Sequence, residues 1–128
     1  MLCAEIQQTI SAMQDVKEAA YFTAALSEVV DEFLQVSEAL TSAVASDANT
    51  GLANATLYLD YAGHIVMAWM HLRILDATGA SKQSEHFVQG KWQSARYFYQ
   101  RELPRTSKWA TTLLENDQSA ADMRDEWF

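Results

Sequence analysis

Three side chains with the chemistry of metal ligands share one side of the most apolar stretch of the sequence. Asp60, His64 and His71 follow one another at intervals of four and seven residues, which brings them onto one face of an α-helix. Carboxylate oxygens and imidazole nitrogens both bind zinc-like ions. The same pattern is also produced by a narrow polar or interface stripe on an otherwise buried helix. We expect that stripe and no bound metal, and we keep the three residues as candidate ligands.

Other patterns that carry chemistry are not found in the sequence. A di-iron helical bundle needs two Glu-x-x-His pairs, and the sequence has none. It also has no glycine-rich phosphate loop and no recognisable Ser-His-Asp arrangement. Cys3 is the single cysteine, and it has no neighbouring base that could activate its thiol. We therefore predict no catalytic residue and no disulfide within the chain.

Two charged residues interrupt the apolar side of a later segment. Lys91 and Glu102 fall among aromatic and aliphatic residues, where a charge needs a partner on another helix or a path to water. Asp60 and Asp76 are candidate partners for Lys91. In the alternative interpretation, the methylene stem of Lys91 lies along the core while its ammonium reaches solvent. The sequence leaves both interpretations open.

Basic residues are concentrated in the middle of the chain. Residues 51–110 hold seven of the nine basic residues, although the net charge of the whole chain is −8. Because such an acidic chain repels phosphate, we exclude nucleic acid as a partner. Arg96, Arg101, Arg105 and Lys108 are candidates for contact with an acidic surface, in this chain or in another subunit. The alternative is that they are ordinary surface cations.

Helices must position these side chains. Ala, Ser, Leu, Glu and Gln are abundant, whereas the sequence has only four glycines and one proline, too few for a protein of many strands and turns. The length of 128 residues suits one domain. We predict an all-α fold, an antiparallel bundle of about four helices. Its segments are a first helix over 1–18, main helices over 22–46, 52–78 and 84–114, and an acidic tail over 115–128.

The spacing of apolar residues predicts what two of the main helices bury. In the 22–46 helix they alternate at intervals of four and three, which indicates a seam packed along a neighbouring helix. The 52–78 helix is apolar on most sides, so we expect it to lie between other elements. The seam residues of the 22–46 helix are Phe22, Leu26, Val29, Phe33, Val36, Leu40 and Ala43.

The remaining segments carry three further expectations. Pro104 lacks an amide donor and should kink the 84–114 helix. Trp127 and Phe128 should dock on the body of the protein, since an exposed aromatic pair is a liability. The most apolar window contains charged residues that disfavour a membrane span, and the first residues lack the pattern of a signal peptide. We therefore expect a soluble, cytoplasmic protein.

Two aromatic runs resemble a known family. The runs ANATLYLDYAGHIVMAWM and FVQGKWQSARYFYQRELPR are similar to the C-terminal helical accessory domain of the acyl-CoA dehydrogenase family, in the subclass with an extra C-terminal domain. In that pattern an aromatic-rich helix ending in Trp is followed by spaced Phe, Lys, Ala-Arg-x-Phe and Leu-Pro. The matching residues are Trp69, Phe87, Lys91, Ala95, Arg96, Phe98, Leu103 and Pro104, with Phe128 as the closing Phe.

The resemblance implies a domain that serves an enzyme without performing its chemistry. Enzymes of the family oxidise the Cα–Cβ bond of acyl-CoA thioesters with FAD, in fatty acid metabolism, and the flavoprotein body with its catalytic glutamate precedes the helical domain. The resemblance therefore brings no catalytic or flavin-binding residue to this chain. It implies packing against that body and, in a homo-oligomer, against a second subunit. A free-standing helical oligomerisation or interaction module without a flavoprotein parent remains the alternative.

Overall fold

Helices make up the regular structure of the protein. The computed structural model describes residues 1–128 and contains no strand, so the prediction of an all-α fold is confirmed. It has six α-helices rather than about four, because the predicted 84–114 helix is divided in two by a π-helical turn and a short helix occupies the predicted loop between the 22–46 and 52–78 helices. The α-helices are α1 (Leu2–Ala12), α2 (Ala20–Ser46), α3 (Ala48–Gly51), α4 (Ala55–Gly79), α5 (Glu85–Tyr97) and α6 (Arg105–Leu114). Two 3-10 turns, Lys17–Ala19 and Asp125–Trp127, and one π-helical turn, Phe98–Glu102, complete the order.

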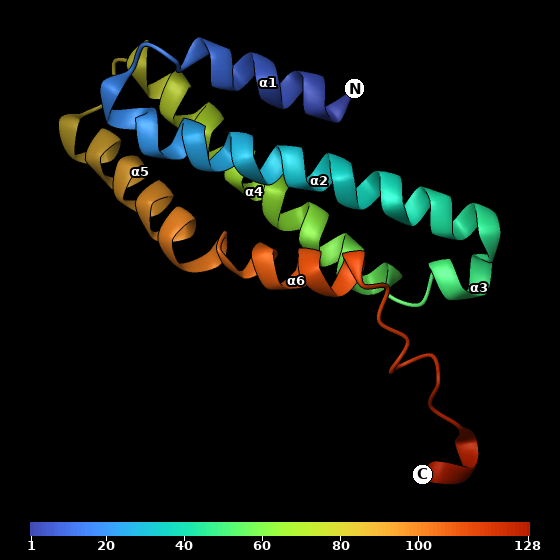
Figure 1. The fold of residues 1–128 in the computed structure, drawn as a ribbon. Helices are drawn as coiled ribbons and strands as arrows, with labels where there is room; N and C mark the ends of the chain where they lie inside the picture. Colours follow the sequence, from blue (N-terminus) through green and yellow to red (C-terminus); the bar gives the residue numbers. More distant parts are fainter.

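The two long helices, α2 and α4, form the centre of the arrangement. They pack on each other, and α4 returns across the molecule in the direction opposite to α2 (Figure 1). Helix α1 packs against both of them along one side. On the other side α5 packs against α4, and α6 packs against both α2 and α4. None of these helices combines the length and apolar character that crossing a membrane requires.

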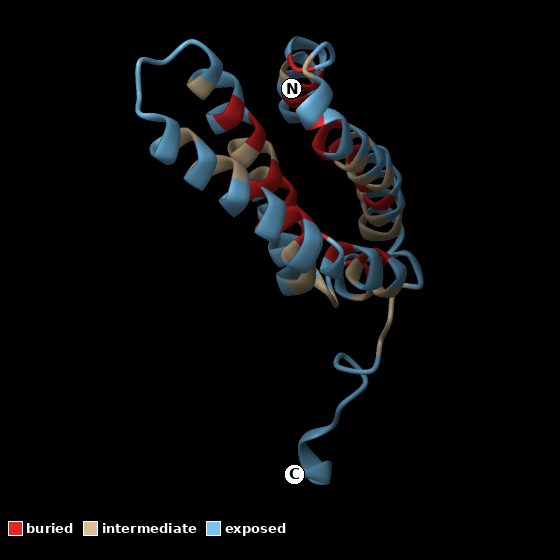
Figure 2. Ribbon diagram, turned by 90° about the vertical axis from the view of Figure 1, so that its left-hand side faces the viewer, coloured by how far each residue is buried: buried red, intermediate tan, exposed pale blue.

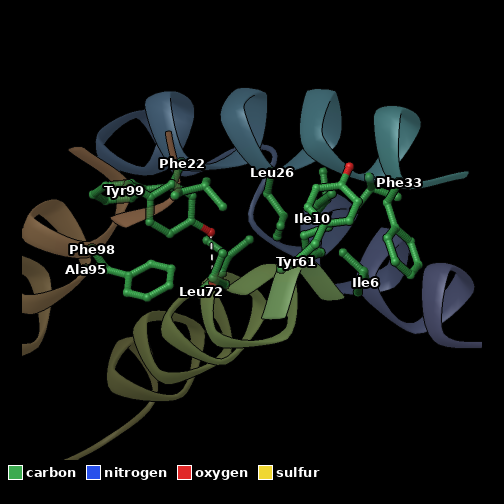
Figure 3. Packing of buried hydrophobic residues seen from close by; sticks show 14 of the residues in the cluster. Ile6, Ile10, Phe22, Leu26, Phe33, Tyr61, Leu72, Ala95, Phe98 and Tyr99 are labelled. Carbon is green, nitrogen blue, oxygen red and sulfur yellow. Dashed lines mark hydrogen bonds between the residues drawn. The ribbon is translucent and has the colours of Figure 1, made fainter. Parts of the chain in front are cut away.

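One continuous core lies between these helices. Twenty buried apolar residues from α1 through α6 form a single cluster, and buried positions line the inner sides of the helices (Figure 2). Aromatic rings join its parts: Phe22 of α2 lies 4.8 Å from Tyr99 and 5.9 Å from Trp92, measured between ring centroids. Figure 3 shows the rings of Phe22 and Tyr99 beside aliphatic side chains of α1 and α4. Burial of this cluster is the main source of folding free energy.

The predicted seam of α2 is buried at four of its seven positions, while Val29, Leu40 and Ala43 are half-buried. Phe22, Leu26, Phe33 and Val36 are buried as predicted. Instead of position 29, which is half-buried, Val30 is completely buried. A straight α-helix repeats every 3.6 residues rather than every 3.5, so the buried face drifts away from a strict heptad pattern.

Short polar contacts start two of the helices. The Asp47 side chain accepts hydrogen bonds from the amides of Asn49 and Thr50 at 3.1 and 3.4 Å and so begins α3. The Ser84 hydroxyl accepts a hydrogen bond from the Phe87 amide at 3.2 Å at the start of α5. These caps fix where the chain turns back on itself.

The tail after α6 does not pack as expected. Trp127 and Phe128 are 62% and 96% exposed, and the segment runs away from the helices (Figures 1 and 2). The expectation that this aromatic pair docks on its own domain is therefore wrong. The periodicity that identifies buried helix faces gives no information on an irregular segment.

Candidate functional site

A π-helical turn sets the geometry of the most distinctive polar cluster. Regular α-helix stops at Tyr97 and resumes at Arg105. Between them the Leu103 amide donates a hydrogen bond to the Phe98 carbonyl at 2.9 Å, five residues back instead of four. Pro104 cannot donate to a carbonyl in the preceding turn, and the widened turn accommodates it. Such π-turns are frequent at functional sites because they change the direction of side chains.

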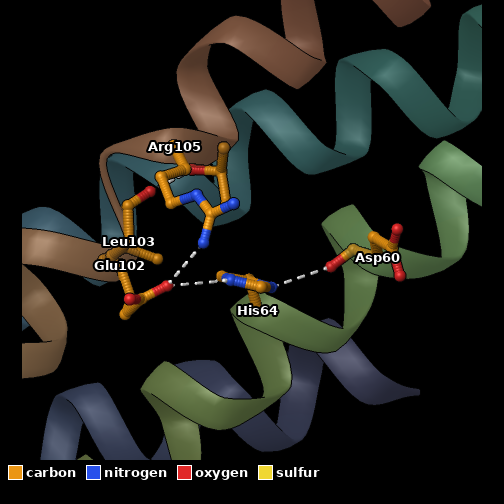
Figure 4. Close-up of polar contacts among 6 residues, drawn as sticks. Asp60, His64, Glu102, Leu103 and Arg105 are labelled. Carbon is orange, nitrogen blue, oxygen red and sulfur yellow. Dashed lines mark hydrogen bonds and ion pairs between the residues drawn. The ribbon is translucent and has the colours of Figure 1, made fainter.

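The π-turn directs Glu102 towards the guanidinium of Arg105 and the imidazole of His64. Its Oε2 lies 2.9 Å from Nη1 of Arg105 and 3.5 Å from Nε2 of His64 on α4 (Figure 4). The other ring nitrogen of His64, Nδ1, lies 3.1 Å from the main-chain carbonyl of Asp60. We call His64, Glu102 and Arg105 the clasp, because together they join α4 to the start of α6.

Aromatic contacts complete the clasp. Trp109 of α6 meets the ring of His64 edge-on, with 4.7 Å between the ring centroids. The Arg105 guanidinium lies 5.3 Å from the centroid of the same indole, a cation–π distance. The hydrogen bond from Arg105, followed by the contact with His64, holds the pKa of Glu102 below its usual value. A charge among apolar residues was expected to need a partner on another helix, and His64 of α4 is that partner of Glu102.

The clasp has acid–base groups but lacks the other parts of a catalytic centre. Its imidazole and carboxylate are both part-exposed, and no serine, threonine or cysteine side chain is hydrogen-bonded to either group. General acid–base catalysis needs such a pair close to a reacting group held out of water. The geometry fits a structural tie between helices.

The three candidate metal ligands do not converge. Both nitrogens of His64 already face oxygens, from Glu102 and from the Asp60 main chain, and the Asp60 carboxylate points away from the ring (Figure 4). The ring of His71 lies tilted against Phe98, with 5.0 Å between centroids. No group of three or more His, Cys, Asp or Glu side chains is close enough to hold a metal ion.

Lys91 has no carboxylate partner within the chain. The contacts between basic and acidic side chains both belong to Glu102, with Arg105 and His64, so neither Asp60 nor Asp76 pairs with Lys91. Its ammonium lies 5.0 Å from the centroid of the Phe87 ring, as expected for a lysine whose stem follows the apolar surface. Burial, and then the positive charge of Lys91, hold the pKa of His71 below its usual value.

The other predicted cations lie on the surface. Arg96, Arg101 and Lys108 are exposed and form no ion pair in this chain. Arg105 pairs with Glu102 and not with the acidic residues of α2. The sequence suggested that these cations could contact an acidic surface in this chain or in another subunit. Within one copy of the chain they do not contact the acidic face of α2.

Hydroxyl groups that the sequence did not single out fasten the helices together. The Tyr61 hydroxyl of α4 donates to Glu32 of α2 at 3.1 Å. Burial raises the pKa of Glu32 and, together with the neighbouring carboxylate, raises that of Tyr61. Trp69 donates from Nε1 to the Thr9 hydroxyl of α1 at 2.8 Å. A tyrosine or tryptophan in an apolar run signals a need for such a partner, but the run does not reveal which residue supplies it.

One face of α4 is apolar and uncovered. We call it the α4 stripe: Leu59, Gly63, Met67, Met70 and Ile74, which recur at intervals of four, four, three and four residues. Leu59, Met67 and Ile74 are 72%, 51% and 41% exposed, and a side chain added at Gly63 would meet nothing within 4 Å. The expectation that α4 lies between other elements thus holds for only part of its circumference. A contiguous apolar stripe of this kind is typical of an interaction surface.

Comparison with protein families gives a match over most of the chain. A family model described as "Acetyl-CoA dehydrogenase C-terminal like" matches residues 2–124. This match spans nearly the whole chain and confirms the resemblance seen in the two aromatic runs. Neither a curated protein nor a solved structure matches the chain.

Proposed function

Because the chain belongs to the family of acetyl-CoA dehydrogenase C-terminal-like domains, we propose that it is a non-catalytic packing domain of an acyl-CoA dehydrogenase-like flavoprotein. In this proposal the parent enzyme oxidises acyl-CoA thioesters at the Cα–Cβ bond with FAD. The domain, an antiparallel helical bundle, packs against the flavoprotein body or a neighbouring subunit.

The α4 stripe is the observation that carries the proposal. A helix in the centre of a small domain that leaves Leu59, Met67 and Ile74 largely exposed lacks a cover for that face within its own chain. Burial of apolar area stabilises by about 25 cal/mol per Å², so a partner surface that covers the stripe gains free energy from it. The flavoprotein body is the partner that family membership suggests.

The surface cations favour the same role. Arg96 and Arg101 on the α5 side have no carboxylate partner in the chain, and cations at the rim of an interface steer a partner and fix its orientation. Lys91 and Arg105 are held by contacts within the chain, with Phe87 and Glu102. We therefore assign Lys91 and Arg105 to the structure of the domain and Arg96 and Arg101 to its contact surface.

Our proposal places no flavin in this chain, and the groove between α2, α3 and α4 is consistent with that. Its volume of about 290 Å³ lies just below the range of about 300–1,000 Å³ for ligand pockets. It is lined by aliphatic residues, Tyr58 and small polar groups, without a cation or glycine-rich loop for a diphosphate. In our proposal FAD and the catalytic base both belong to the body of the parent.

Binding of the chain to the flavoprotein body tests the proposal. The two are expressed separately, and the affinity is measured by titration calorimetry. Met67→Glu places a charge in the α4 stripe and should weaken binding at least tenfold. Leu34→Glu is the matched control, because Leu34 of α2 is 50% exposed, as Met67 is; it should bind as the wild type does. Equal loss in both variants, or no binding by the wild type, contradicts the proposal.

The alternative is a free-standing interaction module. The same stripe would then be covered by an identical or unrelated helical surface, without any flavoprotein. A wild-type chain that does not bind the body but self-associates through Met67 would support this alternative.

A further inference from the structure

An open groove runs along the outer side of the contact between α4 and α5. Its lining includes His71 of α4, Gly90, Ser94 and Tyr97 of α5, and Phe98 of the π-turn. A Cβ on Gly90 would meet nothing within 4 Å, and the Ser94 hydroxyl donates to the Gly90 carbonyl at 2.9 Å. The floor therefore consists of small groups without an unused hydroxyl donor, next to an aromatic ring. We call it the α4–α5 groove.

Large apolar side chains stand along both edges of the α4–α5 groove. On α4, Met67 and Ile74 lie one turn before and one turn after His71, and both are exposed. On α5, Phe87 lies one turn before Gly90, and Phe87 and Tyr97 are exposed. Since Met67 and Ile74 also belong to the α4 stripe, the groove and the stripe form one continuous apolar surface.

The α5 edge of this surface is positively charged. Residues 80–101 carry four basic residues and one acidic residue, whereas the rest of the chain carries five and sixteen. Arg101 follows Tyr97 by four residues, close to one turn, and it is exposed without an ion pair. The neighbouring Glu102 already pairs with Arg105. Complementary charge across an interface favours a partner that brings carboxylates to this edge.

We propose that the α4–α5 groove binds an amphipathic α-helix of the flavoprotein body, with apolar residues on one face and carboxylates beside them. Two packed helices receive the side-chain ridge of a third at an interaxial distance of about 8–10 Å, and helix-in-groove binding uses apolar anchors one turn apart. The assignment of this helix to the flavoprotein body rests on the proposed function. It adds which element of the partner binds and what chemistry that element has.

The acidic segments of this chain do not suit the α4–α5 groove. Helix α2 has four acidic residues and no basic one, but Phe22, Leu26 and the rest of its apolar face are buried in its own core. A second copy therefore cannot offer α2 as an amphipathic ligand. The acidic tail leaves the domain beside the start of α4, where Asn54 holds the Asp117 carbonyl, and leads away from the helices (Figures 1 and 2).

Filling the groove tests the proposal by titration calorimetry with the separately expressed flavoprotein body. Gly90→Trp places an indole in the open space at Gly90, so the variant should fold and bind the body at least about tenfold more weakly, because the incoming helix meets an overfilled site. Gly90→Ala adds one methyl group and is the matched control, with wild-type affinity expected. Wild-type affinity in Gly90→Trp overturns the proposal.

Reversing the charge at the groove edge tests the carboxylates of the incoming helix. Arg101→Glu should weaken binding to the body about tenfold and reduce its dependence on salt. Lys108→Glu, which changes the net charge equally at another exposed cation without an ion pair, should bind as the wild type does. Equal affinities of the two variants overturn the proposal.

Cross-linking identifies the element that lies in the groove. Arg101→Lys keeps the charge and supplies an amine, which a carbodiimide joins directly to a carboxylate in contact with it. Mass spectrometry should locate the bond on an aspartate or glutamate of a helix of the body. A bond to a second copy of this chain, to a loop or strand of the body, or no bond between chains overturns the proposal.

The outcomes separate this inference from the proposed function. If the wild type binds the body and Met67→Glu weakens binding while Gly90→Trp and Arg101→Glu do not, the proposed function stands and the groove does not hold the partner helix. If the wild type does not bind the body, both are wrong.

Discussion

The hydroxyl of Tyr99 donates a hydrogen bond to the main-chain carbonyl of Ala68 across a distance of 2.8 Å. Tyr99 belongs to the π-turn and Ala68 to the middle of α4, so this bond fastens the turn to the central helix. The Tyr99 ring also packs on Phe22 of α2. Burial raises the pKa of Tyr99 above its usual value, so the hydroxyl keeps the proton that it donates.

Removing this hydroxyl should weaken the fold by a moderate amount. Tyr99→Phe keeps the ring in place and should lower the free energy of unfolding by about 0.5–1.5 kcal/mol. Urea denaturation monitored by circular dichroism measures the change. Tyr97→Phe, at an exposed position, is the control and should stay within about 0.5 kcal/mol of the wild type. Tyr99→Phe with wild-type stability would contradict the role of this bond.

The contribution of the clasp to stability should depend on pH. In the folded protein the pKa of Glu102 is lowered, chiefly by Arg105. The ionised Glu102 therefore stabilises the native state at pH values above its unfolded pKa of about 4.3. That stability disappears as the pH falls through the lower, folded pKa. Glu102→Gln should therefore have a lower urea midpoint than the wild type at about pH 7, and the gap should close towards about pH 3. A gap of the same size at both pH values argues against the clasp.

Lys91 should influence the titration of His71. The pKa of His71 is lowered by burial and then by Lys91, so Lys91→Met should raise it while leaving it below its usual value. NMR titration of the imidazole resonances measures the shift, and Lys82→Met, at an exposed position, is the control. An unshifted His71 in Lys91→Met would show that the two side chains do not interact.

The lowered pKa of His71 also has a consequence for stability. The unfolded chain binds this proton more readily than the native state, so stability should fall as the pH drops through the unfolded value of about 6.5. His71→Phe, which retains an aromatic contact with Phe98, should reduce this loss in urea denaturation at a series of pH values. An identical pH profile for variant and wild type contradicts a lowered pKa of the half-buried His71.

Two glycines should respond to alanine in opposite directions. A Cβ on Gly51 would lie 2.5–2.8 Å from the backbone of α2, which cannot move aside cheaply, so Gly51→Ala should destabilise by about 1–3 kcal/mol. A Cβ on Gly90 meets nothing within 4 Å, and Gly90→Ala should stabilise α5 by about 0.5–1 kcal/mol. Thermal unfolding ranks the two variants against the wild type. A stable Gly51→Ala would mean that α3 does not pack closely on α2.

The sequence predicted the helices and their apolar faces better than it predicted which of those faces other helices cover. Apolar spacing identified four buried positions of α2, because the helical period depends on the backbone alone, but Val30 is buried instead of Val29, and Leu40 and Ala43 are only half-buried. The apolar character of α4 did not reveal that Met67 and Ile74 face outward. A sequence shows which sides of a helix avoid water, but it does not show whether the same chain supplies a cover for each of them.

The polar contacts were the least predictable part of the site. The sequence indicated that Glu102 needs a partner, but it did not identify His64, because that contact depends on how the π-turn rotates the chain against α4. Pro104 signalled an interruption without indicating its type. The undocked Trp127 follows an irregular segment, where no periodicity constrains the direction of the side chain.

Elution of flavin absorbance with the chain is the most direct test of the central claim. The chain is mixed with the flavoprotein body that the proposal assigns to it, and the mixture is separated by size-exclusion chromatography with detection in the blue. We predict that the chain and the flavin absorbance elute together, earlier than either component alone. Separate elution of two folded components would contradict the assignment of this chain as a packing domain of a flavoprotein.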